Sequence, residues 1–165
     1  MRDLKTLVST YAQPGRIEEI WLRPARLAEP VSVQDAQIIE EGLSGDHARP
    51  GKRAVTLIQA EHLAVVGALL GQGPVEARKL RRNLVVSGIN LVALKGRRVA
   101  VGCAVLEWTT VCAPCSRMEK ALGEGGYSAL RGHGGWCARV LRPGRIAVGD
   151  RVEPLPDDAL VQESR

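Results

Sequence analysis

Apolar residues fall into short runs that are separated by glycine-containing turns. Within these runs, valine, leucine, isoleucine and tryptophan dominate, which is typical of β-strands. The pattern predicts strands at residues 17–22, 54–58, 84–86, 98–101, 104–109, 136–141 and 146–148. Glycines at 51, 88, 96, 102, 144 and 149 lie in the turns between or beside these strands.

One segment has a helical rather than an alternating pattern. Apolar residues within 59–70 recur at helical spacing, so this segment is the clearest predicted helix. Residues 116–122 and 127–131 predict shorter helices. Many short strands with few helices indicate a mainly β (α+β) fold, a β-barrel of short strands with a few peripheral helices.

The chain length limits the organisation to one domain. With 165 residues, 45% hydrophobic and 25% charged, the chain can bury a sizeable core without disulfides or metal. We expect a single barrel domain over residues 1–153 and a short C-terminal tail over 154–165, with one helical turn at most. There is no internal repeat and no low-complexity tract.

The charge is distributed unevenly along the chain. The net charge is +5, but the segment 42–151 alone carries +10, whereas 1–41 and 152–165 are acidic. A basic middle segment indicates an anionic partner, and the alternative is a solvated basic surface without a ligand. The motifs of this segment, described below, favour the anionic partner. Only 3% of residues are aromatic and none is Phe, so a base-stacking surface is not expected and nucleic acid is not the predicted partner.

Apolar runs are too short for a membrane span, and the first residues lack the apolar stretch of a signal peptide. We therefore expect no membrane partner and a cytoplasmic location. In that compartment the four cysteines are expected to be mostly reduced thiols.

Two basic segments are candidates for binding an oxyanion. The first is the glycine-rich loop 42–53, whose backbone amides together with Arg49, Lys52 and Arg53 suit a phosphate. Its glycine spacing is not that of a P-loop, and a plain surface hairpin is the alternative. The second is the segment 77–83, which places four cations immediately before a predicted strand; the alternative there is a solvated face.

A third candidate is the segment 109–119, which contains Cys112-Ala-Pro-Cys115. Cys115 is expected at the start of a helix, with Ser116 as the alternative cap, where Arg117 would also favour a thiolate. A structural zinc site formed by these cysteines with His133 and Cys137 is a weaker alternative. Thioredoxin-like chemistry is weaker still, because the motif does not follow the first strand of a βαβ unit.

In their order along the chain, several short motifs resemble the MOSC domain, named for the C-terminal part of molybdenum cofactor sulfurases. They are Gly-Leu-Ser-Gly-Asp at 42–46, Lys-Arg-Ala-Val-Thr-Leu-Ile at 52–58, Arg-Arg-Asn at 81–83, Ala-Pro-Cys at 113–115, Ala-Arg-Val at 138–140 and Val-Gly-Asp-Arg-Val at 148–152. The resemblance covers about residues 15–153 and is closest to the small, stand-alone bacterial type.

The resemblance implies a β-barrel and a site for molybdenum cofactor, a pterin that carries an anionic phosphate. It places the family cysteine, which ligates molybdenum or carries a persulfide in related proteins, on Cys115. The candidate cofactor-binding residues are Arg81, Asn83, Lys52, Arg53, Asp46, Arg49 and Ser116. Cys112 and Cys137 lie outside the motif, and Cys112 is a candidate resolving thiol.

Two functions follow from this resemblance. The first is a molybdenum-dependent reductase of N-hydroxylated compounds such as hydroxylamine-type base analogues, with a separate protein as electron donor. The alternative is a sulfur carrier that uses a cysteine persulfide supplied by a cysteine desulfurase, because no pyridoxal-phosphate lysine motif is visible in the chain. Substrate and oligomeric state are not determined by the sequence.

Overall fold

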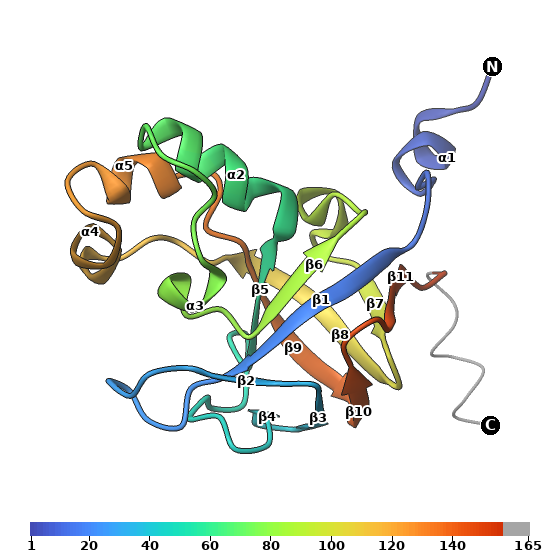
Figure 1. The fold of residues 1–165 in the computed structure, drawn as a ribbon. Helices are drawn as coiled ribbons and strands as arrows, with labels where there is room; N and C mark the ends of the chain where they lie inside the picture. The colour runs from blue at the N-terminus through green and yellow to red at the C-terminus, as the bar shows by residue number, and fades with distance from the viewer. Residues whose placement is uncertain (157–165) are drawn as a thin grey trace.

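The computed structural model describes residues 1–156, and its main feature is a closed β-barrel (Figure 1). Seven strands follow one another around it in the order β11-β7-β8-β9-β5-β6-β1, and β1 pairs with β11 to close the ring. The barrel strands are β1 (Gly15–Leu22), β5 (Val55–Gln59), β6 (Leu84–Ser87), β7 (Arg98–Val101), β8 (Ala104–Val111), β9 (Trp136–Arg142) and β11 (Arg151–Pro154). The predicted β-barrel is therefore confirmed.

All neighbouring barrel strands run antiparallel except β5 and β6, which are parallel. A parallel pair needs a crossover connection, and this crossover carries the helices α2 (Ala60–Leu69) and α3 (Ala77–Leu80). Two further helices, α4 (Ser116–Leu122) and α5 (Gly126–Leu130), lie between β8 and β9 along the chain. The helices lie beside the barrel on one side (Figure 1).

Smaller elements complete the described part of the chain. A second sheet has the order β10-β3-β4, and β2 pairs with the end of β1. These elements are α1 (Leu4–Val8), β2 (Val31–Val33), β3 (Asp35–Ile39), β4 (Gly42–Leu43), the 3₁₀ helix η1 (Leu91–Leu94) and β10 (Gly144–Ala147).

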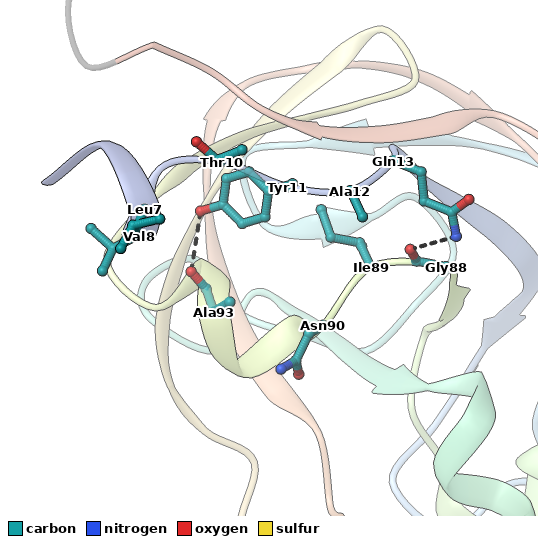
Figure 2. A pocket seen from close by; sticks show the side chains of 10 residues that line it. All are labelled: Leu7, Val8, Thr10, Tyr11, Ala12, Gln13, Gly88, Ile89, Asn90 and Ala93. Carbon is teal, nitrogen blue, oxygen red and sulfur yellow. Dashed lines mark hydrogen bonds between the residues drawn. The ribbon is translucent and has the colours of Figure 1, made fainter. Parts of the chain in front are cut away.

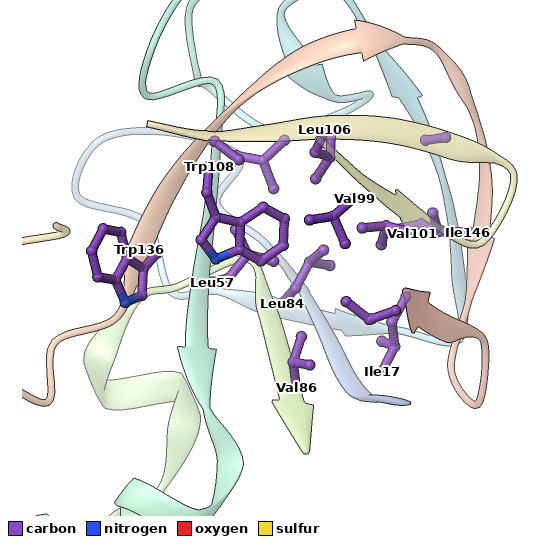
Figure 3. Packing of buried hydrophobic residues seen from close by; sticks show 14 of the residues in the cluster. Ile17, Leu57, Leu84, Val86, Val99, Val101, Leu106, Trp108, Trp136 and Ile146 are labelled. Carbon is purple, nitrogen blue, oxygen red and sulfur yellow. The ribbon is translucent and has the colours of Figure 1, made fainter. Parts of the chain in front are cut away.

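The barrel interior is filled by large apolar side chains (Figure 3). Ile17, Leu57, Leu84, Leu106 and Trp108 are fully or almost fully buried within it. A second cluster, which includes Ile58, Val66, Leu80, Val85, Met118 and Leu130, packs the helices against the outer wall of the barrel. Strand β5 is buried on both faces, because Val55 and Leu57 point into the barrel while alternate side chains point to the covered outer face.

Most predicted elements are confirmed. The helix predicted at 59–70 is α2 with Gln59 at its N-cap, and 116–122 is α4. The strand predicted at 146–148 is β10, but its bounds differ, since β10 begins two residues earlier and ends at Ala147. The sequence pattern did not predict α1, β2, β3, β4, α3, η1 or β11.

The predicted tail begins inside β11, where Pro154 pairs with Val99, and most of it (157–165) lies outside the described residues. No helix within residues 1–156 has the length and hydropathy needed to cross a membrane.

Candidate functional site

A pocket of about 340 Å³ lies on the outer face of the barrel wall, beneath the glycine-rich loop between β4 and β5. It is lined by Arg23, His47, Ala48, Arg49, Arg53, Thr56, Cys112 and Cys137, which we call the basic pocket. Thr56 lies directly opposite Cys137 in the β5–β9 ladder, so the two side chains point to the same face of the sheet. The apolar neighbours of these two residues point into the barrel instead.

An ion pair forms one wall of this pocket. Arg23 follows β1, and its guanidinium donates to the carboxylate of Asp46 at 2.8 and 3.1 Å, while its backbone N–H donates to the same carboxylate at 2.6 Å. The Asp46 side chain is fully buried and that of Arg23 is 14% exposed. Burial alone would raise the pKa of Asp46, but the hydrogen bonds and charge of Arg23 outweigh it and lower the pKa.

Asn83 connects this ion pair to the barrel wall. Its amide nitrogen donates to Asp46 and to the Trp21 carbonyl, both at 3.1 Å. Its amide oxygen accepts from the backbone N–H of Thr56 at 3.1 Å and from Arg23 at 3.3 Å. Asn83 is fully buried, so in this structure its amide binds protein groups and positions Arg23 and Thr56.

The two arginines before Asn83 hold backbone segments around the pocket. Arg81 adopts a left-handed conformation (φ 57°), and its guanidinium binds carbonyls in the loop after β1, including that of Ala28 at 2.6 Å. Burial lowers the pKa of Arg81, and the charges of Arg117 and Arg23 lower it further. Arg82 is buried and donates to the carbonyls of Gly134 and Leu80, each at 2.8 Å.

Two cysteines meet at the pocket floor. Cys112 follows β8, and its N–H donates to the carbonyl of Gly135 at 2.8 Å; Cys137 is the second residue of β9 and is 1% exposed. A hydrogen bond from the Cys137 thiol lowers the pKa of Cys112 to about 6, against the opposing effect of burial, and Arg82, Arg53 and Arg23 lower it further. The same pairing raises the pKa of Cys137.

Two of the three predicted loop cations line this pocket. Arg49 and Arg53 line it, as does His47, whose ring lies 2.9 Å from the Arg23 carbonyl oxygen. Lys52 is exposed and does not line it. No hydrogen bond or ion pair found among residues 1–156 involves the side chain of Arg49 or Arg53, so both guanidiniums are available for an anion.

Cys115 is the N-cap of α4, as the sequence predicted, and Ser116 is the first residue of that helix. Both are exposed, and neither lines the basic pocket. The predicted thiol therefore lies three residues along the chain from the pocket cysteine. Its assignment as metal ligand remains a prediction.

The alternative zinc site is not assembled. Within residues 1–156, no three His, Cys, Asp or Glu side chains are grouped closely enough to hold a metal ion. His133 instead pairs with His62, with the two Nδ1 atoms 3.3 Å apart, and His62 lines another hollow. Burial and the neighbouring imidazole lower the pKa of His62.

A hollow of about 480 Å³ lies between α1 and η1, where the Tyr11 hydroxyl donates to the Ala93 carbonyl (Figure 2). Its lining residues include no charged side chain. The basic pocket is smaller but combines cations with a thiolate, so we take it as the candidate site.

The sequence analysis did not identify Arg23 and Thr56 as site residues. A buried carboxylate such as that of Asp46 requires a cationic partner, so the existence of a partner could have been predicted. Its identity could not, because Arg23 lies far from Asp46 in the sequence. The Cys112–Cys137 contact depends on the β8–β9 pairing and was likewise not predicted.

Comparison with known proteins identifies relatives of this fold. The sequence model of the MOSC domain family matches residues 41–153, which contain nearly all of the basic pocket. The YuaD protein from Bacillus subtilis superposes with a TM-score of 0.75 at 17% identity, over 88% of this chain and 98% of that one. No curated protein sequence matches significantly.

Two further solved structures share the fold. YiiM from Geobacillus stearothermophilus gives a TM-score of 0.72 at 18% identity, over 87% of this chain and 76% of that one. YiiM from Escherichia coli gives 0.65 at 18% identity, over 86% and 70%. At such identities the likeness establishes the fold alone.

Proposed function

Because the chain belongs to the MOSC domain family, we propose that it binds molybdenum cofactor and reduces N-hydroxylated compounds, such as hydroxylamine-type base analogues. A single observation carries the proposal: a pocket of about 340 Å³ brings three guanidiniums and a thiolate together. MOSC domains are associated in general with binding this cofactor.

The chemistry of the pocket fits such a group. Guanidiniums bind phosphate and other oxyanions through paired, charge-assisted hydrogen bonds, and Arg49 and Arg53 have none of their own within residues 1–156. The volume lies within the roughly 300–1,000 Å³ range of small-molecule sites. Thiolates are preferred ligands of soft metal centres, and Cys115 is exposed close by in sequence.

Each residue then has a definite role. Arg49 and Arg53 would bind the anionic phosphate or pterin oxygens. Lys52 and Ser116 are exposed but do not line the pocket, so they would contact only a part of the cofactor that extends beyond it. Asp46 and Asn83 keep the Arg23 guanidinium fixed at the pocket wall. Cys115 would ligate molybdenum. When bound, the cofactor supplies two-electron redox chemistry, and a separate protein would supply the electrons.

The thiols favour a second candidate, a sulfur carrier. Cys112 has a lowered pKa and lies three residues from exposed Cys115, so one segment offers a reactive thiolate and an accessible thiol. In this alternative, Cys115 receives persulfide sulfur from a cysteine desulfurase and passes it to a metal–sulfur centre.

Expression in cells that make the cofactor separates the two. The reductase proposal predicts near-stoichiometric molybdenum and dye-linked reduction of a hydroxylamine base analogue, both lost in Cys115→Ala and retained in Cys103→Ala, which also removes an exposed thiol. Absence of molybdenum together with a persulfide on Cys115, seen by mass spectrometry, supports the carrier. Full loading of Cys115→Ala would refute the ligand assignment.

A further inference from the structure

Cys112 and Cys137 form a pair of reduced thiols that the MOSC motifs do not include. They come from neighbouring strands: Thr110 lies opposite Cys137 in the β8–β9 ladder, and Cys112 lies two residues beyond Thr110 on the same side. Both side chains line the basic pocket. The two thiols are therefore diagonal neighbours on the same face of the β8–β9 pair.

The two thiols differ in access and in protonation. Cys112 is partly exposed and lines an open pocket, so a small solute can reach it, whereas Cys137 is buried. The neighbouring thiol of Cys137 and, to a smaller extent, the guanidiniums of Arg82, Arg53 and Arg23 favour the Cys112 thiolate, with a pKa of about 6. Arg49 and His47 complete the charged and titratable lining of the pocket. An accessible thiolate beside a second thiol is the arrangement of a redox-sensitive cysteine pair.

We infer that Cys112 and Cys137 are a peroxide-sensitive dithiol, in which Cys112 is the attacking sulfur and Cys137 is the resolving sulfur. This goes beyond the proposed function, because neither thiol is the predicted molybdenum ligand. The dithiol reaction needs no bound cofactor, so the inference can be tested on the protein without it.

The reaction balances with hydrogen peroxide as the oxidant. The Cys112 thiolate attacks one peroxide oxygen, the O–O bond breaks, and hydroxide leaves and is protonated to water, giving a sulfenic acid. The Cys137 thiol then loses its proton and attacks the Cys112 sulfur, so that an S–S bond forms and a second water leaves. Overall, two thiols and one peroxide give one disulfide and two waters, and a thiol reductant reverses the change.

The backbone around Cys112 can accommodate this bond. Closing the disulfide requires the sulfurs to approach to about 2.05 Å. Cys112 lies after the last residue of β8 and keeps one backbone hydrogen bond to Gly135, and residues 113–115 belong to no helix or strand, so this side of the pair has fewer backbone restraints than Cys137. Cys137 stays fixed within β9.

Disulfide formation would change the basic pocket itself. It removes the thiolate charge that faces Arg23 and Arg53 and joins two side chains across the pocket floor. The oxidised pocket is therefore more cationic and shallower than the reduced one. Peroxide would thus alter which anions the pocket accepts.

The test treats purified full-length chain, made without cofactor, with one equivalent of hydrogen peroxide. Trypsin leaves Cys103, Cys112 and Cys115 together on peptide 99–117 and Cys137 on peptide 132–139, so single variants must assign the bond. We expect a cross-link between these peptides in the wild type, Cys103→Ser and Cys115→Ser, and none in Cys112→Ser. Dithiothreitol should remove it.

Cys137→Ala and Cys137→Ser both test the resolving role, and circular dichroism reports whether each folds. Either folded variant should form a sulfenic acid on Cys112 that a dimedone probe captures, with no disulfide. The inference is overturned if the wild-type cross-link uses Cys115 or Cys103. It is also overturned if Cys112 proceeds to sulfinic acid without a cross-link at one equivalent of peroxide.

Discussion

Asp46 and Arg23 are joined through both side chain and backbone, since the Asp46 carboxylate accepts from the Arg23 guanidinium and from the Arg23 N–H. Asp46 belongs to the glycine-rich loop and Arg23 follows β1, so this contact fixes the loop to the barrel. The basic pocket lies beside this contact, lined by Arg23 and by loop residues that include His47 and Arg49.

Asp46→Asn should destabilise the protein by about 3 kcal/mol, because removing one partner of a buried ion pair leaves the other charge poorly compensated. Urea unfolding measures the loss. Asp35→Asn is the matched control, since its ion pair with Arg145 is exposed and should contribute little. Equal losses in the two variants would refute the anchoring role of Asp46.

The same carboxylate should contribute to acid sensitivity. Its folded pKa is lower than the ordinary value of 3.8, so the ionised form stabilises the folded state. This stabilisation is fully present above about pH 3.8 and is lost as the pH falls through the folded pKa. Unfolding free energies measured from about pH 4 downward should therefore fall more steeply in the wild type than in Asp46→Asn. Parallel curves would contradict the lowered pKa.

Alkylation of Cys112 by iodoacetamide should follow a titration with a midpoint near pH 6. Cys137→Ala should raise that midpoint, because it removes the hydrogen bond that most lowers the pKa. Arg53→Ala should raise it by a smaller amount. Mass spectrometry of the alkylated peptide follows the rate. A midpoint above pH 8 in the wild type would show that Cys112 is an ordinary thiol.

Gly135 should be intolerant of substitution. Its φ is +91°, and an added Cβ would collide with the Leu57 carbonyl oxygen, next to the strand that carries Cys137. Gly135→Ala should cost more than about 3 kcal/mol, or prevent folding. Gly132→Ala is the control: its φ is +80° but the surrounding space is open, so only backbone strain of about 1–2 kcal/mol is expected. Thermal unfolding compares them, and a smaller loss in Gly135→Ala would contradict this packing.

The sequence predicted the barrel well because its strands carry strong local signals. The apolar runs that became β5, β7, β8 and β9 are bounded by turns, and the period of 59–70 is clearly helical. Strand β4 has only two residues and β3 pairs with β10 far along the chain, so neither has a local pattern strong enough to predict.

The site was predicted in part for a similar reason. Arg49 and Arg53 were identified because the basic loop is a continuous segment. The positions of Arg23 and Thr56 at the pocket depend on how strands from distant parts of the chain come together. The proximity of Cys112 to Cys137 depends on the β8–β9 pairing in the same way. The local sequence carries no signal for such pairing. Asn83 was identified from its motif, but its burial and its protein-bound amide required the structure.

The most direct test of the central claim, an anionic pterin–molybdenum group held by the basic pocket, is the molybdenum content of chains purified from cofactor-producing cells. The wild type should contain about one molybdenum per chain, and Arg49→Ala/Arg53→Ala should lose at least about tenfold, as expected when charge-assisted bonds to a phosphate are removed. Arg151→Ala, on β11 across the barrel, should load normally. A wild type without molybdenum, or a fully loaded double variant, would contradict the claim.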